Sequence, residues 1–147
     1  MAQPKSLPLI CVPEGSTLST VSKAHHRWAQ ANNFTGQRGR LLALPASDGG
    51  LSGYLFGLGP MADRPKLVVG LASAALDPGS YVLEGDFGDP TLAGLGFRLG
   101  AYRFDAYREP KAPPVLDVLP GADMAEVDRL TDAAFLARDL VNTPAHD

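Results

Sequence analysis

The sequence lacks several features that would define a function class. A single cysteine, Cys11, in 147 residues allows no internal disulfide, which fits a reducing compartment. The formal net charge of −3 argues against a nucleic-acid partner, because binding to phosphates requires a basic surface. No apolar run approaches the ~20 residues of a membrane-spanning helix, and the run 7–12, interrupted by Pro8, is too short for a signal peptide. We therefore expect a cytoplasmic protein with no membrane or nucleic-acid partner.

Catalytic motifs are also missing. The sequence contains no Gly-x-Ser-x-Gly, His-Glu-x-x-His or Cys-x-x-Cys motif. A metallohydrolase needs clustered Asp, Glu, His or Cys ligands, and a catalytic nucleophile needs a base within reach. The carboxylates of this chain fall at predicted helix caps, turns and solvated helix faces. We therefore predict no catalytic, no cofactor-binding and no metal-binding residue in the chain.

What the sequence does contain is an alternation of short apolar strands and amphipathic helices. Its 45% of hydrophobic and 20% of charged residues are typical of a globular domain, and 147 residues are enough for one. Strands are predicted at 7–12, 41–44, 51–58, 80–83 and 114–120, and helices at 17–31, at 90–102 and from 123 onward. The segment 66–76 fits either a strand or a helix, and a short helix is favoured because 77–79 then breaks it. This order predicts an α/β fold.

Local patterns add detail to this arrangement. Asp48-Gly49-Gly50 predicts a tight hairpin, so the strands on either side of it should be antiparallel neighbours. The strand at 51–58 carries apolar residues at both alternating sets of positions, and such a strand is covered on both faces. Asn32-Asn33 should end the first helix, since asparagine tolerates the left-handed conformation there.

The helix at 90–102 is predicted to start at Asp89-Pro90, with Asp89 as its N-cap. Helical spacing predicts a buried face formed by Leu92, Leu95, Gly96 and Leu99. Glycine is costly inside a helix, by about 1 kcal/mol relative to alanine. Its recurrence at 94, 96 and 100 therefore predicts a helix backbone that lies close to the sheet.

Four stretches hint at a binding site, and in each a structural role is the favoured interpretation. His25-His26, near Trp28, cannot share a metal, because adjacent helical residues point about 100° apart; we expect one half-buried and one exposed histidine. Gly36–Arg40 precedes a strand and not a helix, which is the wrong context for a phosphate loop. Gly57-x-Gly59 is half of a dinucleotide fingerprint, and Pro60 follows where a helix would open. The aromatic and basic stretch 102–108 is interpreted as anchors at a helix exit.

The last predicted helix is the longest element. Asp123 and Glu126 predict a capping box at its start, where both carboxylates meet the positive end of the helix dipole. Asn142-Thr143-Pro144 stops the helix, and the chain ends three residues later, as expected if a further domain were about to begin. An apolar stripe runs between these points. Its members are Val127, Leu130, Ala134, Ala137 and Val141, broadened by Leu136 and Leu140.

The final stretch, AFLARDLVNTPAHD at 134–147, resembles the domain junction of the leucyl aminopeptidase (cytosol aminopeptidase) family. In that family a long helix ending in Arg-Asp-Leu-x-Asn-Thr-Pro links a small N-terminal α/β domain to the catalytic domain. The segment LGAYRFDAY at 99–107 and the strand end at 56–59 are similar to it as well. The resemblance extends in order from about residue 30 to residue 147, and His146 departs from it, because the family more often has asparagine there.

The resemblance implies a macro-domain-like fold with three layers, in which a mixed sheet is flanked by helices. It also implies a division of the chain. Residues 1–122 would form this N-terminal α/β domain, and residues 123–147 would form a linker helix with the start of a junction to a missing C-terminal catalytic domain. It implies a full-length enzyme that removes N-terminal, leucine-like residues from peptides. Two divalent metals, zinc or manganese (or magnesium), would be held by Lys, Asp and Glu residues of the catalytic domain, and the enzyme would be a homo-hexamer. This chain would be inactive, with no cofactor of its own and an accessory role in packing, access or regulation.

Two other functions remain open at this point. One is a stand-alone macro-like module that binds a nucleotide or ADP-ribose, for which Gly57-x-Gly59 is the sole support in the sequence. The other is a structural interaction domain, which would present a flat apolar patch and no deep pocket. The aminopeptidase interpretation also predicts that the surface near Leu136, Leu140 and Val141 faces the missing domain and is exposed in this chain.

Overall fold

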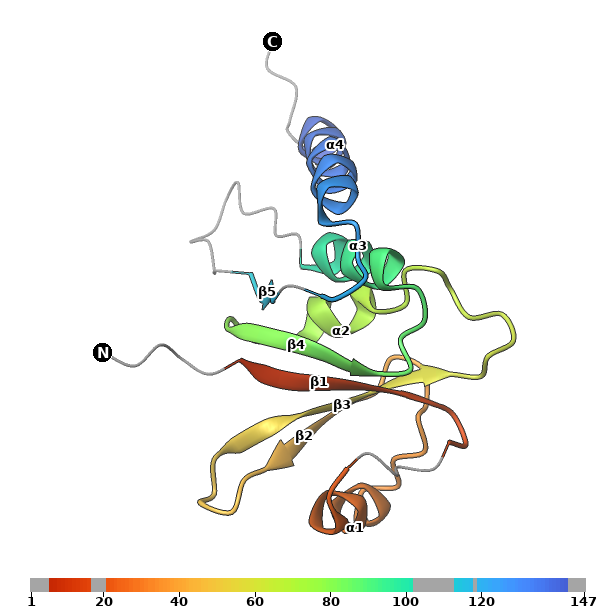
Figure 1. Cartoon of the computed structure of the whole chain (residues 1–147), viewed down its shortest axis with the longest axis vertical. Coiled ribbons are helices and arrows are strands. Elements are labelled where there is room, and N and C mark those ends of the chain that lie inside the picture. The colour runs from red at the N-terminus through yellow and green to blue at the C-terminus, as the bar shows by residue number, and fades with distance from the viewer. Residues whose placement is uncertain (1–5, 17–20, 102–112, 118, 143–147) are drawn as a thin grey trace.

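The computed structural model describes residues 6–16, 21–101, 113–117 and 119–142. These residues form a mixed five-stranded sheet flanked by helices (Figure 1), so the predicted α/β fold is confirmed. The elements in chain order are β1 (Leu7–Pro13), α1 (Lys23–Ala31), β2 (Leu41–Pro45), β3 (Leu51–Gly59), α2 (Gly70–Ala75), β4 (Ser80–Gly85), α3 (Pro90–Gly100), β5 (Val115–Leu116) and α4 (Met124–Asn142).

The sheet has the strand order β2-β3-β1-β4-β5. β1 lies at its centre and pairs in parallel with both β3 and β4, so that Leu9 is opposite Tyr54 on one side and Leu83 on the other. β2 pairs with β3 in antiparallel orientation, as the Asp48-Gly49 turn predicts. In that turn Asp48 Oδ1 accepts a hydrogen bond of 2.8 Å from the N–H of Gly50.

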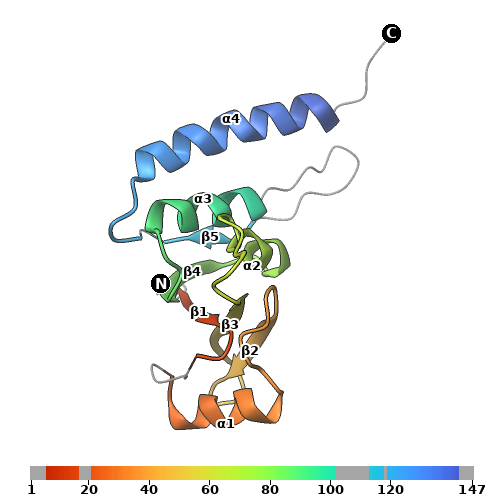
Figure 2. The same cartoon turned by 90° about the vertical axis from the view of Figure 1, so that its right-hand side faces the viewer.

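Each face of the sheet carries its own hydrophobic core. α2 and α3 cover one face and α1 covers the other, as the two views in Figures 1 and 2 show. Alternate residues of β3 enter opposite cores, because Phe56 and Leu58 pack under α2 and α3 whereas Leu55 packs under α1. The prediction that this strand is covered on both faces is therefore confirmed. Leu9 and Cys11 of β1 also join the first core, and Val12 joins the second.

Helix α1 begins later than predicted. Ser22 is its N-cap and accepts a hydrogen bond from the N–H of His25 (3.2 Å), so the described part of the helix starts at Lys23 and not at Thr17. Residues 17–20 lie outside the described part of the chain. The end is as predicted, since Asn32 caps the helix and Asn33 adopts a left-handed φ of 56°.

Helix α3 starts as predicted, but its glycines serve a different contact. Asp89 caps it by accepting a hydrogen bond of 3.0 Å from the N–H of Leu92. A Cβ atom on Gly96 would lie 3.2 Å from the main chain of Leu67, and one on Gly100 would lie 2.1 Å from the carbonyl oxygen of Gly70. The close backbone approach of Gly96 and Gly100 is thus to α2 and the turn before it, and not to the sheet as predicted. Gly94 does face the sheet, since its Cβ would lie 4.0 Å from Leu116 of β5.

The buried face of α3 also differs from the prediction. Ala93 and Phe97 are 2% and 1% exposed, whereas Leu92, Leu95 and Leu99 are half-buried. The glycines explain this shift, because a helix that approaches another backbone through glycine rotates its bulky leucines to the flanks of the contact. Helical spacing alone does not carry this information.

Helix α4 lies along the outer side of α3, which separates it from the sheet in both views (Figures 1 and 2). Val127 and Thr131 are buried at 0% and 2% exposure, whereas Ala137, predicted on the buried stripe, is exposed. Arg98 of α3 forms an ion pair with Asp128 of α4. The boundary predicted at residue 122 between domain and linker stays a prediction.

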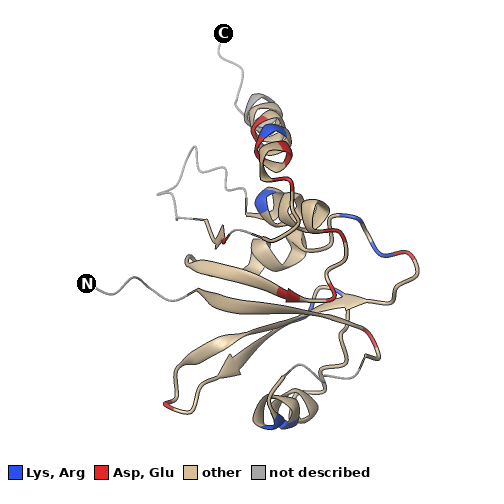
Figure 3. Cartoon of the chain, viewed as in Figure 1, with Lys and Arg blue, Asp and Glu red and all other residues tan. Residues whose placement is uncertain are grey.

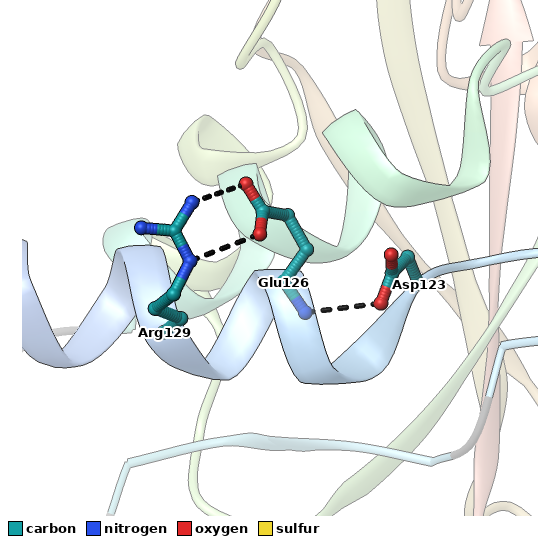
Figure 4. A network of polar contacts seen from close by, with 3 residues as sticks. All are labelled: Asp123, Glu126 and Arg129. Carbon is teal, nitrogen blue, oxygen red and sulfur yellow. Dashed lines mark hydrogen bonds and ion pairs between the residues drawn. The ribbon is translucent and has the colours of Figure 1, made fainter.

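The predicted capping box of α4 forms only in part. Asp123 Oδ1 accepts a hydrogen bond of 3.0 Å from the N–H of Glu126, but the Glu126 carboxylate turns away and binds Arg129 at 2.6 Å and 3.0 Å (Figure 4). The N–H of Asp123 instead donates to the hydroxyl of Thr91 on α3, at 2.9 Å. The start of α4 is therefore fixed by a neighbouring helix as well as by its own sequence.

The last strand is shorter than predicted. β5 comprises two residues that pair in parallel with β4, and one further hydrogen bond, from the N–H of Asp117 to the carbonyl of Tyr81 (2.9 Å), extends the contact. The aromatic stretch 102–108, predicted as an anchor, lies outside the described residues.

Candidate functional site

The histidine pair of α1 holds the helix to the edge of the sheet. His25 is half-buried and His26 is exposed, as predicted. His25 Nε2 lies 3.2 Å from the carbonyl oxygen of Pro45 and 3.1 Å from Oγ of Ser52, and Trp28 Nε1 donates to the carbonyl of Ala43 at 2.8 Å. These contacts satisfy carbonyl groups of the edge strand β2. They fix α1 in place and bring no second metal ligand to His25.

The two glycine-bearing stretches that resemble phosphate-binding motifs in sequence hydrogen-bond to each other. The N–H of Gly57 donates to the carbonyl of Arg40 (2.8 Å), that of Gly39 donates to Gly57 (2.9 Å), and that of Gly59 donates to Gly36 (2.8 Å). A Cβ atom on Gly57 would lie 1.8 Å from the carbonyl oxygen of Gln37. The glycines therefore allow two main-chain segments to meet. The space in which a pyrophosphate would lie is filled by the protein itself.

The two arginines of this loop bind main-chain oxygens. Arg38 donates to the carbonyls of Leu58 (3.3 Å) and Pro60 (3.2 Å) beyond β3. Arg40 donates to the carbonyls of Asn33 (2.7 Å) and Asn32, at the end of α1, and its guanidinium lies 5.8 Å from the ring centre of Phe34. The prediction that residues 36–40 connect a helix to a strand is confirmed. The two arginines stabilise this connection by their hydrogen bonds to main-chain carbonyls at the end of α1 and at the end of β3.

Cys11 and Arg64 form a different environment on the other side of the sheet. Cys11 is 2% exposed, and burial raises the pKa of its thiol to about 12, although the positive charge of Arg64 acts in the opposite direction. The thiol therefore stays protonated at neutral pH and is a poor nucleophile. Nε and Nη2 of Arg64 are buried, and neither has a hydrogen-bond partner among the residues that the structure describes.

The charged side chains do not gather into a metal site within the described ranges. No group of three or more His, Cys, Asp or Glu residues there is placed to hold a metal ion. Figure 3 shows Asp and Glu spread over several helices and loops, with Lys and Arg between them. Among the described residues, no helix is long and apolar enough to cross a membrane. The polar groups described above therefore serve the α/β fold.

The chain belongs to the family described as the M17 aminopeptidase, N-terminal domain, whose model matches residues 13–120. Among solved structures it is similar to the cytosol aminopeptidase from Coxiella burnetii, with 26% identity and a TM-score of 0.78 over 98% of this chain and 33% of that chain. The bottromycin maturation enzyme BotP in complex with Mn has the same fold, with 24% identity, a TM-score of 0.70, and coverage of 95% of this chain and 32% of that chain. No curated protein matches the sequence.

Two consequences follow from these comparisons. The chain spans about a third of the length of the aminopeptidase structures that it matches, so it corresponds to one part of such an enzyme. The alternative of a stand-alone nucleotide or ADP-ribose module is not supported. The matching family is an aminopeptidase domain, and the space beside Gly57 is occupied by the main chain of residues 36–37 and that beside Gly59 by Arg38.

Proposed function

We propose that this chain is the non-catalytic N-terminal domain of a cytoplasmic metallo-aminopeptidase that removes N-terminal, leucine-like residues from peptides. The observation that carries the proposal is the family match over residues 13–120, together with the 98% of this chain that aligns to 33% of a cytosol aminopeptidase. The catalytic residues would lie in the remaining two-thirds of such an enzyme.

The metals of this enzyme, zinc or manganese, would be bound outside this chain. Two divalent ions supply Lewis-acid chemistry and an activated water in enzymes of this kind. The described residues do not fit such a centre, because no cluster of three potential ligands occurs among them and the Cys11 thiol is buried and protonated. No step of peptide hydrolysis is therefore assigned to a residue of this chain.

The proposed role of the domain is accessory: it packs against the catalytic domain and shapes access to it, in an enzyme that would assemble as a homo-hexamer. Leu136 on α4 supports this role, since its side chain is 63% exposed, as predicted for a surface that faces another domain. The first turns of α4 are fixed to α3 by the buried Val127 and by the Arg98–Asp128 ion pair. The described part of the helix thus combines a fixed inner side with an exposed leucine. The side chains of Leu140 and Val141, predicted on the same surface, lie outside the described residues.

The test is an aminopeptidase assay on the purified chain with leucine p-nitroanilide and added manganese or zinc. We expect no turnover above the rate of the buffer with metal. Robust turnover by the pure chain would contradict a non-catalytic role. The DNA downstream of codon 147 gives a second test, because continuation of the reading frame into a catalytic domain is expected.

A further inference from the structure

Arg64 lies where the topology of the sheet places ligand sites in α/β proteins. The chain leaves β1 toward α1 on one face and leaves the adjacent β3 toward α2 on the other (Figures 1 and 2). Ligands bind outside the carboxyl ends of parallel strands at such a divergence of connections. Arg64 belongs to the segment between β3 and α2, and it is close enough to Cys11, near the carboxyl end of β1, to act on the thiol electrostatically.

The guanidinium of Arg64 has two nitrogen donors without a hydrogen-bond acceptor in the described part of the chain. Its Nε and Nη2 atoms are both buried and have no hydrogen-bond partner in the described part of the chain. These two nitrogens lie on the same edge of the planar group, the edge that donates two parallel hydrogen bonds to an oxyanion. A permanently charged group withdrawn from water is costly unless its donors find an acceptor.

Other arginines of the chain have acceptors. Arg38 and Arg40 bind main-chain carbonyls, and Arg98 and Arg129 pair with carboxylates. The acidic residue of neighbouring β4 does not compensate Arg64. Glu84 is opposite Ile10, which packs into the core under α1, so successive side chains place Glu84 and Cys11 on different faces of the sheet.

We propose that Arg64 binds a small oxyanion, a phosphate or a carboxylate, at the carboxyl ends of β1 and β3. Nε and Nη2 donate to two oxygens of the anion. The site takes an anion and not a nucleotide, because the glycines that would approach a pyrophosphate are packed against residues 36–38. This inference is independent of the proposed aminopeptidase role.

The experiment measures thermal unfolding of the chain in inorganic phosphate or acetate, each against sodium chloride at equal ionic strength. A ligand that binds the folded state stabilises it with the logarithm of its concentration, so Tm should rise by about 4 °C per tenfold increase in the anion above its Kd. Arg64→Met should abolish this rise. Arg64→Lys, which keeps the charge without the fork, should weaken binding by about tenfold or more. Arg27→Met removes an exposed charge on α1 and is the matched control, expected to respond as wild type.

A second measurement does not depend on the folding of a variant. The Arg64 Nε–H resonance of the wild-type chain should shift saturably as phosphate is titrated. An equal rise of Tm in the Arg64→Met variant would show a general salt effect and overturn the proposal. So would the absence of any response of the wild type to both anions. If Arg64→Met does not fold, an Nε–H resonance unmoved by phosphate and by acetate would overturn it.

Discussion

Replacement of Gly57 by alanine tests whether this glycine serves the fold or a ligand. Gly57 is buried in β3, and its N–H and carbonyl groups bind Arg40 and Gly39 at 2.8 Å and 2.9 Å. An added Cβ would lie 1.8 Å from the carbonyl oxygen of Gln37 and 2.6 Å from the carbonyl carbon of Gly36. Because both obstacles are main chain, a rotamer change cannot relieve the clash.

The size of the effect follows from what has to move. A normal contact requires the loop at 36–40 to retreat by about 1.5 Å, which breaks the hydrogen bonds that join it to β3. Two or three buried main-chain bonds at about 1 kcal/mol each, with about 1–3 kcal/mol for overpacking, give a loss of about 3–6 kcal/mol. That is a large fraction of the stability of a typical domain, about 5–15 kcal/mol.

The assay is equilibrium unfolding in urea followed by circular dichroism, with Gly94→Ala as the matched control. A Cβ on Gly94 of α3 would lie 3.6 Å from Val127 Cγ2, an ordinary contact, so this change should stabilise the helix by up to about 1 kcal/mol. If Gly57→Ala costs less than about 1 kcal/mol, the loop does not fill the space beside this glycine. The structural explanation of the glycine pair would then be refuted.

Alanine substitutions on α4 test how this helix packs, and the pH dependence of stability tests the burial of Cys11 and Tyr81. Val127→Ala should lower the free energy of unfolding by about 2 kcal/mol, because Val127 is fully buried. Leu136→Ala should change it by less than about 0.5 kcal/mol, since Leu136 is 63% exposed. Equal losses, measured by urea unfolding, would contradict this orientation of α4. Burial raises the pKa of Cys11 from 9.0 and of Tyr81 from 10.0, each to about 12. The folded chain then keeps protons that the unfolded chain loses, so stability should fall as pH rises from 9 to 12. In Cys11→Ala the free energy of unfolding should decrease less between pH 9 and 12 than in the wild type. An unchanged pH dependence would argue against a buried thiol.

The sequence predicts the elements of this fold well because their signals are local. The Asp48-Gly49 turn, the Asp89 cap and the apolar pattern of β3 each act within a few residues, and each appears in the structure. What the sequence does not predict depends on partners far along the chain. The N–H of Asp123 is capped by Thr91, 32 residues away, which leaves Glu126 free to bind Arg129.

The same distinction applies to the candidate sites. Gly57 and Gly59 resemble half of a cofactor motif in sequence, and only the fold places residues 36–38 against them. Arg64 gives no signal in sequence, because an isolated arginine in a polar loop is typical of a solvated surface. Its importance arises from the burial of Nε and Nη2 beside the central strand. No pattern in the sequence indicates that Arg64 lies near Cys11, which is 53 positions earlier in the chain.

The anchoring of α4 bears directly on how this domain would be joined to another. Its start is held by the Thr91 hydroxyl, by Val127 against α3 and by the Arg98–Asp128 ion pair, all within the first two turns. Two turns further on, Leu136 is exposed. A helix held firmly at its start projects its later turns in a direction set by α3, since a helix of 19 residues is stiff over its length. The direction of α4 is therefore set by side chains of α3 and by its own first turns.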